Sequence, residues 1–108
     1  MEKAENFDIL NGTLLQYTGN AAEVVIPEGV ESVGTEAFLG CKNLVSVVIP
    51  QGVTCIEDYA FADCENLESI SIPESVRNIE TFAFDNCKNL ASIIFPNRLE
   101  TIEEFAFV

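Results

Sequence analysis

Apolar and polar positions in this chain repeat with a period of 23 residues. Its four prolines stand at positions 27, 50, 73 and 96, and an apolar pair or an alternating apolar segment precedes each of them. The columns that keep the same phase are Val33, Ile56, Ile79 and Ile102; Ala37, Ala60, Ala83 and Ala106; Phe38, Phe61, Phe84 and Phe107; Cys41, Cys64 and Cys87; Asn43, Asn66 and Asn89; and Leu44, Leu67 and Leu90. So many columns in one phase predict structurally equivalent coils that stack on one another.

Each repeat contains one short strand pattern. In residues 44–49, Leu44, Val47 and Ile49 are expected to face inward, whereas Ser46 and Val48 face outward. The proline that follows ends the strand, because it has no N–H to donate to a β-ladder. Residues 53–56 are then expected to return the chain across the far wall, and residues 59–61 to place an aromatic ring under the coil.

The unit of 23 residues is too small to fold alone, because ordering its backbone costs more free energy than its few apolar side chains return. Stacking removes this deficit, since neighbouring coils cover each other's apolar faces and share backbone hydrogen bonds at about 4.8 Å spacing. We therefore expect a leucine-rich-repeat solenoid, made mainly of short β-strands in stacked 23-residue coils.

The segment before the first repeat predicts a β-hairpin. Asn11-Gly12 is a favoured two-residue turn, and it lies between the apolar runs of residues 7–10 and 13–17. The expected division is a lead-in and N-terminal β-hairpin cap in residues 1–23, followed by one continuous repeat domain in residues 24–108. That domain holds three full repeats, beginning at Val24, Val47 and Ile70, and an incomplete fourth.

The repeated pattern resembles the BspA-like, Treponema-type leucine-rich repeats of bacterial surface antigens. The resemblance rests on the alternating apolar residues before proline and on the Val-x-x-Ile, Ala-Phe, Cys and Leu columns, and it covers about residues 20–108. It implies a secreted or cell-surface location and adhesion to host matrix proteins or to other cells. The matching residues are core and turn residues, so the resemblance is specific for the fold rather than for a ligand.

Charge and composition exclude several functional classes. With 18 acidic and five basic residues the formal net charge is −13, which opposes binding to nucleic acids and direct contact with anionic membranes. The chain contains no histidine, so the usual acid/base and zinc-binding side chain is missing. No cofactor is expected, and no column combines a nucleophile with a base, so we do not expect an enzyme. The acidic start, residues 1–6, lacks the pattern of a signal peptide, which leaves a cytoplasmic location open.

The repeated cysteines and asparagines are expected to serve the fold. The column of Cys41, Cys64 and Cys87 suits small buried thiols, whereas Cys55 lies outside it and is expected to be partly exposed. Neighbouring coils could bring two cysteines within disulfide range, but three in one column leave an odd one. The asparagine column is expected to bond backbone groups at a corner.

Acidic residues form a second recurring feature. They are Glu57, Asp58, Glu80, Glu103 and Glu104. This ridge could attract Ca²⁺, but it lacks the interleaved Asp and Gly of a calcium-binding loop, so a solvated face is the preferred interpretation.

Two hypotheses about function remain. The first is a recognition module that binds a protein or peptide, such as a host or matrix protein, through the outward residues of the strands. These candidate ligand-binding residues are Glu23, Val25, Ser46, Val48, Ser69, Ser71, Ser92 and Ile94. The alternative is a structural spacer within a larger surface or intracellular protein. Residues 93–108 are in addition expected to allow end-to-end self-association, because they leave a coil face and a strand edge uncovered.

Overall fold

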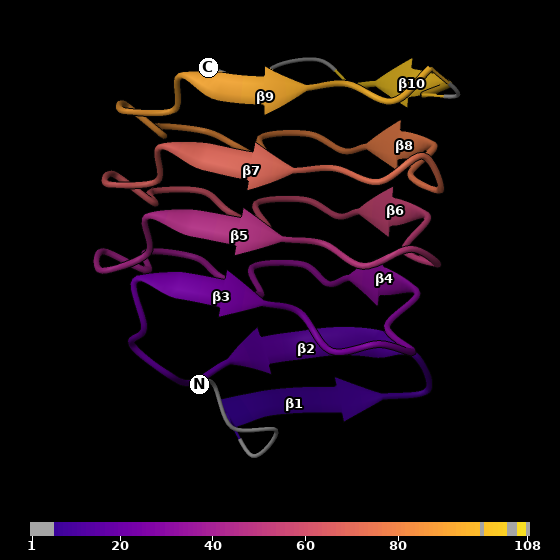
Figure 1. Cartoon of the computed structure of the whole chain (residues 1–108), viewed down its shortest axis with the longest axis horizontal. Coiled ribbons are helices and arrows are strands. Elements are labelled where there is room, and N and C mark those ends of the chain that lie inside the picture. Colours follow the sequence, from indigo (N-terminus) through magenta and orange to yellow (C-terminus); the bar gives the residue numbers. More distant parts are fainter. Residues whose placement is uncertain (1–5, 98, 104–105, 108) are drawn as a thin grey trace.

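The computed structural model describes residues 6–97, 99–103, 106 and 107, and it leaves the side chain of Ile94 undescribed. The chain forms a stack of coils in which strands from successive repeats lie above one another (Figure 1). The strands are β1 (Phe7–Leu10), β2 (Thr13–Tyr17), β3 (Glu23–Val25), β4 (Ser32–Val33), β5 (Ser46–Val48), β6 (Cys55–Ile56), β7 (Ser69–Ser71), β8 (Asn78–Ile79), β9 (Ser92–Ile94) and β10 (Thr101–Ile102). Within the described ranges there is no helix of the length and apolar character needed to cross a membrane.

The coils contribute to two sheets. One sheet has the order β3-β5-β7-β9, and the other has the order β1-β2-β4-β6-β8-β10. The register pairs Val24 with Val47, Val47 with Ile70 and Ile70 with Ile93, which confirms the 23-residue coil. The sequence pattern predicted the strands of the first sheet and, in the second sheet, the hairpin strands β1 and β2. The rest of the second sheet was expected as a returning turn, because the two-residue strands β4, β6, β8 and β10 are too short to show an alternating pattern.

The third side of each coil consists of turns that also form a hydrogen-bonded ladder. The N–H groups of Phe38, Phe61 and Phe84 donate to the carbonyl oxygens of Ala60, Ala83 and Ala106, at 2.7 to 2.8 Å. These bonds link each turn to the turn of the next coil. Hydrogen bonds between coils therefore run along this side as well as along both sheets, which satisfies backbone groups that the turns would otherwise leave unpaired.

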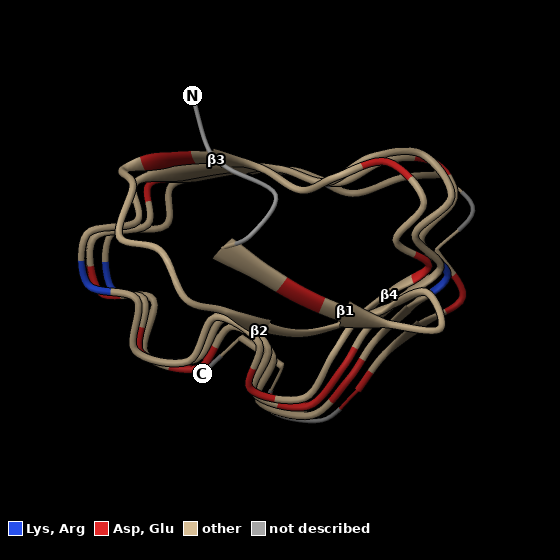
Figure 2. Ribbon diagram, turned by 90° about the horizontal axis from the view of Figure 1, so that it is seen from below, with Lys and Arg blue, Asp and Glu red and all other residues tan. Residues whose placement is uncertain are grey.

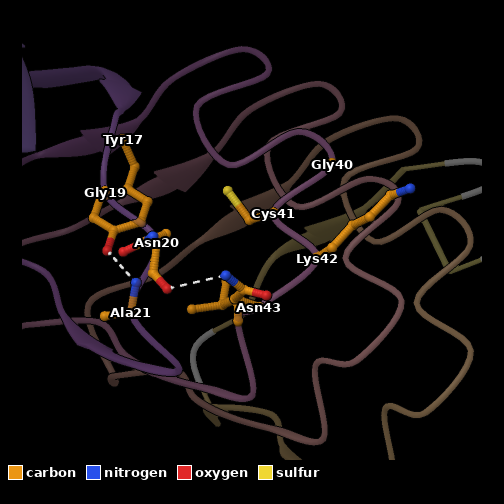
Figure 3. Close-up of a pocket in the computed structure, with 9 residues that line it drawn as sticks. Tyr17, Gly19, Asn20, Ala21, Gly40, Cys41, Lys42 and Asn43 are labelled. Carbon is orange, nitrogen blue, oxygen red and sulfur yellow. Dashed lines mark hydrogen bonds between the residues drawn. The ribbon is translucent and has the colours of Figure 1, made fainter.

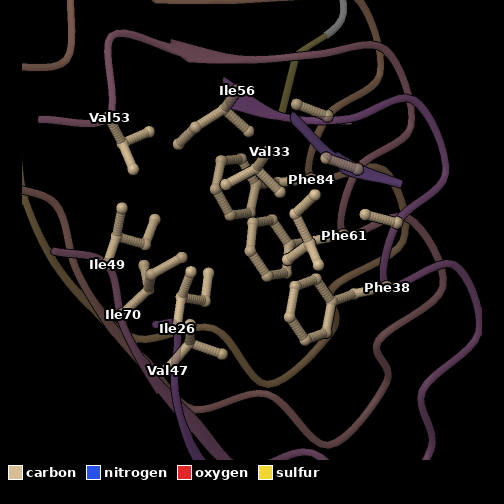
Figure 4. Packing of buried hydrophobic residues seen from close by; sticks show 14 of the residues in the cluster. Ile26, Val33, Phe38, Val47, Ile49, Val53, Ile56, Phe61, Ile70 and Phe84 are labelled. Carbon is tan, nitrogen blue, oxygen red and sulfur yellow. The ribbon is translucent and has the colours of Figure 1, made fainter. Parts of the chain in front are cut away.

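The core lies inside the coils and confirms the predicted alternation. Leu44, Val47 and Ile49 are 1%, 2% and 3% exposed, whereas the side chain of Val48 is 46% exposed. Phenylalanine rings stack through the middle of the molecule (Figure 4), with 4.8 Å between the ring centres of Phe38 and Phe61. Each coil thus buries its apolar side chains against the next coil as well as against its own walls.

An N-terminal hairpin covers one end of this core. Asn11 and Gly12 both have positive φ, at 51° and 83°, as the predicted tight turn requires. Seen along the stack, β1 lies across the end of the coils, inside their outline (Figure 2). The ring of Tyr17 stacks on Phe38 at 5.1 Å, so the cap extends the aromatic column beyond the repeats.

The cap is joined to the repeats through a sheet. β2 pairs in parallel with β4 of the first coil. At this junction Gly34 approaches the cap so closely that a Cβ atom there would lie 2.5 Å from the carbonyl oxygen of Leu14. The division into residues 1–23 and 24–108 remains a prediction, since cap and coils share one sheet.

Candidate functional site: the outer face of the four-stranded sheet

The eight predicted binding residues lie in two rows on the sheet formed by β3, β5, β7 and β9. We call the outer face of this sheet the strand wall. One row pairs Glu23, Ser46, Ser69 and Ser92 in register, and the other pairs Val25, Val48, Ser71 and Ile94. The rows arise because the coils share one phase and because alternate residues of a strand face the same side. The backbone of Ile94 belongs to the second row, but its side chain lies outside the described part of the molecule.

The strand wall presents both apolar and hydroxyl groups to solvent. Val25 and Val48 are 62% and 46% exposed. Glu23, Ser71 and Ser92 are exposed, while Ser46 and Ser69 are half-buried. Ser71 of β7 pairs with Val48 of β5. Because serine is the shorter side chain, the surface over β7 is lower than the surface over β5.

A groove of about 560 Å³ follows this depression. Of the predicted residues, Ser46, Val48, Ser69, Ser71 and Ser92 line it, whereas Glu23 and Val25 do not. Six further residues line it, which are the buried core residues Val47, Ile70 and Ile72 and, in addition, Glu74, Phe95 and Pro96, which the prediction missed. Phe95 occupies the column of the buried Ile26, Ile49 and Ile72, which predicts an inward side chain, yet it is 41% exposed. The aromatic ring in place of isoleucine was the only sequence signal for this difference.

The groove combines surfaces that suit a protein ligand. Val48 and Phe95 offer apolar contact, the serines offer hydroxyl donors and acceptors, and Glu74 contributes a carboxylate. The Glu74 carboxylate accepts a hydrogen bond from the Asn97 backbone N–H at 3.3 Å. None of the described residues that line the groove is basic. It can therefore bury apolar groups and pair with a cation, but it has no charge with which to hold an anion.

The asparagine column binds backbone groups, as predicted, but its partners lie in the preceding coil. The side-chain amides of Asn43, Asn66 and Asn89 donate to the carbonyl oxygens of Asn20, Lys42 and Glu65, at 3.3, 2.7 and 3.0 Å. These bonds hold neighbouring coils together at one corner. The structure thus supports a structural role for this column.

Two acidic residues of the predicted ridge, Glu57 and Glu80, accept hydrogen bonds from neighbouring side chains. The Glu57 carboxylate accepts hydrogen bonds from the hydroxyls of Ser32 and Thr35. Acidic residues follow this part of the coils in a band (Figure 2). In the described ranges no group of three or more His, Cys, Asp and Glu side chains is arranged to hold a metal ion. Glu104, which was expected to extend the ridge, lies outside the described residues.

The cysteine column is less uniformly buried than predicted. Cys64 is fully buried, whereas Cys41 and Cys87 are half-buried, and all four cysteines are free thiols. Cys55 is half-buried, as expected. Burial, followed by the nearby charge of Glu80, raises the pKa of the Cys55 thiol to about 12. The expectation of a fully buried column was wrong for Cys41 and Cys87, although both are packed against the buried core.

Comparisons with known proteins identify the repeat. The family model described as "BspA type Leucine rich repeat region (6 copies)" matches residues 9–108. A leucine-rich repeat protein of T. pallidum has a crystal structure that is 34% identical, with a TM-score of 0.89, and the match covers 95% of this chain and 53% of that one. The chain therefore spans about half the length of that protein. A search of curated protein sequences found no match.

Two further bacterial structures share the fold. The pneumococcal vaccine antigen PcpA is 26% identical with a TM-score of 0.85, over 89% of this chain and 24% of that one. A leucine-rich repeat protein from Bacteroides capillosus is 27% identical with a TM-score of 0.79, over 89% of this chain and 80% of that one. Together with the repeat columns and the matching coils, the family model shows that this chain belongs to the BspA-type leucine-rich repeat family.

Proposed function

We propose that this chain is a non-enzymatic protein-recognition module that binds its partner through the strand wall. The observation that carries the proposal is the groove of about 560 Å³, which gathers five of the eight residues selected from the sequence. Repeat solenoids offer extended surfaces of this kind for binding. The family is one of repeat scaffolds, which favours binding over catalysis.

The chemistry of the groove indicates which partner fits. Val48 and Phe95 favour an apolar segment, and Glu74 favours a basic side chain near its edge. The formal charge of −13 adds a long-range attraction toward basic proteins. We therefore infer a protein or peptide partner that carries apolar and basic side chains, rather than a nucleic acid or an anionic membrane.

The relatives support a place at the bacterial surface. One solved relative is described as a vaccine antigen. We propose on this basis that the chain is displayed outside the cell and contacts host or matrix proteins. Self-association of residues 93–108 is a second contact that we propose, and the exposed Phe95, Ile102 and Phe107 support it.

A binding experiment with two valine variants tests the strand wall. Immobilised extracellular-matrix proteins are probed with the wild-type chain, with Val48→Glu and with Val25→Glu. The two valines share a column and a sheet, and both are exposed, but only Val48 lines the groove. Both variants add the same charge, so a difference between them isolates the groove. Circular dichroism controls for folding.

We expect Val48→Glu to weaken binding at least about tenfold, or about 1.4 kcal/mol, because a carboxylate would enter an apolar contact. Val25→Glu should change binding by less than about threefold. If both folded variants bind like the wild type, the strand wall is not the site. If the wild type binds no matrix protein and no cell surface, the structural spacer becomes the better hypothesis.

A further inference from the structure

A cavity between the cap and the first coil opens in front of one cysteine. It has a volume of about 310 Å³, and its lining comes from Tyr17 and residues 19–21 on the cap side and from residues 40–44 of the first coil. Figure 3 shows the Cys41 sulfur directed into the space beside Tyr17, while the Lys42 side chain extends away from it. Gly19 and Gly40 also line this cavity, so no side chain from either position fills it.

The opening exists because the first coil has no complete coil before it. In the next two coils the thiols of Cys64 and Cys87 each donate to the carbonyl oxygen of a preceding phenylalanine, Phe38 or Phe61, at 3.1 Å. The chain that precedes Cys41 is instead the irregular segment after β2. In this segment the Ala21 N–H donates to the Tyr17 hydroxyl at 3.1 Å, and the Asn20 carbonyl accepts from the Asn43 side chain at 3.3 Å.

A second thiol lies directly behind Cys41. The carbonyl oxygen of Phe38 accepts from the Cys41 backbone N–H at 3.2 Å and from the Cys64 thiol at 3.1 Å. The sulfur of Cys64 therefore lies beside the backbone of Cys41, in the neighbouring coil. The strands that flank the two cysteines pair in parallel, so equivalent residues of these coils lie about 4.8 Å apart, within the range that a disulfide spans.

We propose that Cys41 and Cys64 form a reactive dithiol that takes small-molecule disulfides. The Cys41 thiolate attacks one sulfur of the disulfide, forms a mixed disulfide and releases one thiol. Cys64 then attacks the Cys41 sulfur, transfers its proton to the departing thiolate and closes a bond between the first two coils. The two cysteines are oxidised, and one small disulfide is reduced to two thiols.

The pKa shifts of the two thiols agree with a first attack by Cys41 and a second attack by Cys64. The side-chain hydrogen bond with Cys64 lowers the pKa of the Cys41 thiol, and the same bond together with burial raises the pKa of Cys64. Burial raises the pKa of Cys87 to about 11. Of the thiols in this column, Cys41 thus combines the open cavity with the greater thiolate content.

Peptide mapping of the wild-type chain tests the proposal without any substitution. The reduced chain is freed of reductant, treated with oxidised glutathione at pH 8, quenched with acid, digested and analysed by mass spectrometry. Cleavage after Lys42 separates Cys41 from Cys55, and cleavage after the acidic residues Glu57 and Asp58 separates Cys55 from Cys64. We expect first a mixed disulfide at Cys41, then a linked peptide pair that contains Cys41 and Cys64, with the loss of two free thiols.

Three variants then assign the roles. Cys64→Ser should stop the reaction at the mixed disulfide on Cys41, and Cys41→Ser should slow thiol loss at least about tenfold. Cys87→Ser is the matched control from the same column and should react like the wild type. Thermal melting checks that Cys64→Ser is folded, and Cys64→Ala replaces it if it is not.

Other results would overturn the proposal. First modification at Cys55 or Cys87 would show that the cavity does not direct the reagent. A mixed disulfide on wild-type Cys41 that never closes would show that Cys64 is not the resolving thiol. Wild-type rates for the folded Cys41→Ser variant would show that Cys41 is not the attacking thiol.

Discussion

The residue type that fits at a given position of this chain depends on the atoms that the adjacent coil or the cap places next to it. The column that contains Glu57, Glu80 and Glu103 begins with Gly34 in the first coil. The repeat pattern by itself would allow glutamate at position 34. The structure explains the glycine, because the cap backbone lies so close that a Cβ atom at position 34 would collide with the Leu14 carbonyl oxygen.

Replacement of Gly34 by the residue of its own column should therefore destabilise the fold. In Gly34→Glu, the Cβ atom would lie 2.5 Å from a backbone oxygen of the cap, so the cap must shift. We expect a loss of about 1 to 3 kcal/mol in the free energy of unfolding, measured by urea denaturation.

Gly40→Asn is the matched control for this substitution. Gly40 has φ of 70° and open space around it, and Asn86 holds φ of 60° at the equivalent position of a later coil. We expect a change of less than about 1 kcal/mol for this variant. Equal losses in both variants would contradict the close approach as the cause.

The half-buried Cys55 predicts a dependence of stability on alkaline pH. Its pKa of about 12 in the folded chain lies above the ordinary thiol value of 9.0. Above pH 9 the unfolded chain loses a proton that the folded chain keeps, so stability is complete below this pH and falls as pH rises toward 12. The contribution is at most about 1.4 kcal/mol per pH unit.

Cys55→Ser isolates this contribution from the other groups that titrate in the same range. The free energy of unfolding, measured by urea denaturation at pH 8, 9, 10 and 11, should fall less steeply for the variant than for the wild type. Parallel curves for the two proteins would contradict the assignment to Cys55.

At the scale of an element, burial alternates along strands of only three residues. Val47 and Val48 are neighbours in β5, yet they are 2% and 46% exposed. The strand is held in this register by pairing with β3 and β7 on both sides. The same short strand therefore supplies both a core residue and a residue of the candidate binding groove.

Alanine substitutions should separate these two roles. Val47→Ala should lower the free energy of unfolding by about 2 kcal/mol, because it removes buried methyl groups. Val48→Ala should change stability by less than about 0.5 kcal/mol. Chemical denaturation of both variants gives the comparison, and an equal loss in both would contradict the inward and outward assignment.

At the scale of the whole molecule, the two ends of the stack differ. The hairpin covers the core at the N-terminal end, whereas the last described coil exposes apolar side chains. Phe107 is 39% exposed, although Phe38, Phe61 and Phe84 in the same column are at most 2% exposed. The Phe107 ring packs against Phe84 and Phe95 and keeps an exposed apolar face that another protein surface can bury.

We expect this surface to cause association that rises with protein concentration and with salt, because salt screens the repulsion between chains of charge −13. Light scattering of the wild type and of Phe107→Glu measures the effect. The variant should stay monomeric at concentrations where the wild type associates, and Leu10→Glu at the capped end serves as the control. A monomeric wild type at high salt would contradict this prediction.

Much of the architecture was readable from the order of residues. The 23-residue period, the inward and outward alternation of residues 44–49 and the Asn11-Gly12 turn all follow from local chemistry that every coil repeats. The stacked phenylalanine column followed from the same repetition. Five groove residues were likewise predictable, because a shared phase places equivalent side chains on one wall.

Other features were decided by the contacts between coils. The second sheet arises from two-residue strands that become strands only when the next coil pairs with them. Phe95 turns a predicted core position into a groove wall, and the cavity at Cys41 exists because a hairpin replaces the preceding coil. Such features depend on which coil or cap packs above and below a residue. A repeated local pattern does not specify this packing partner at the first and last repeats.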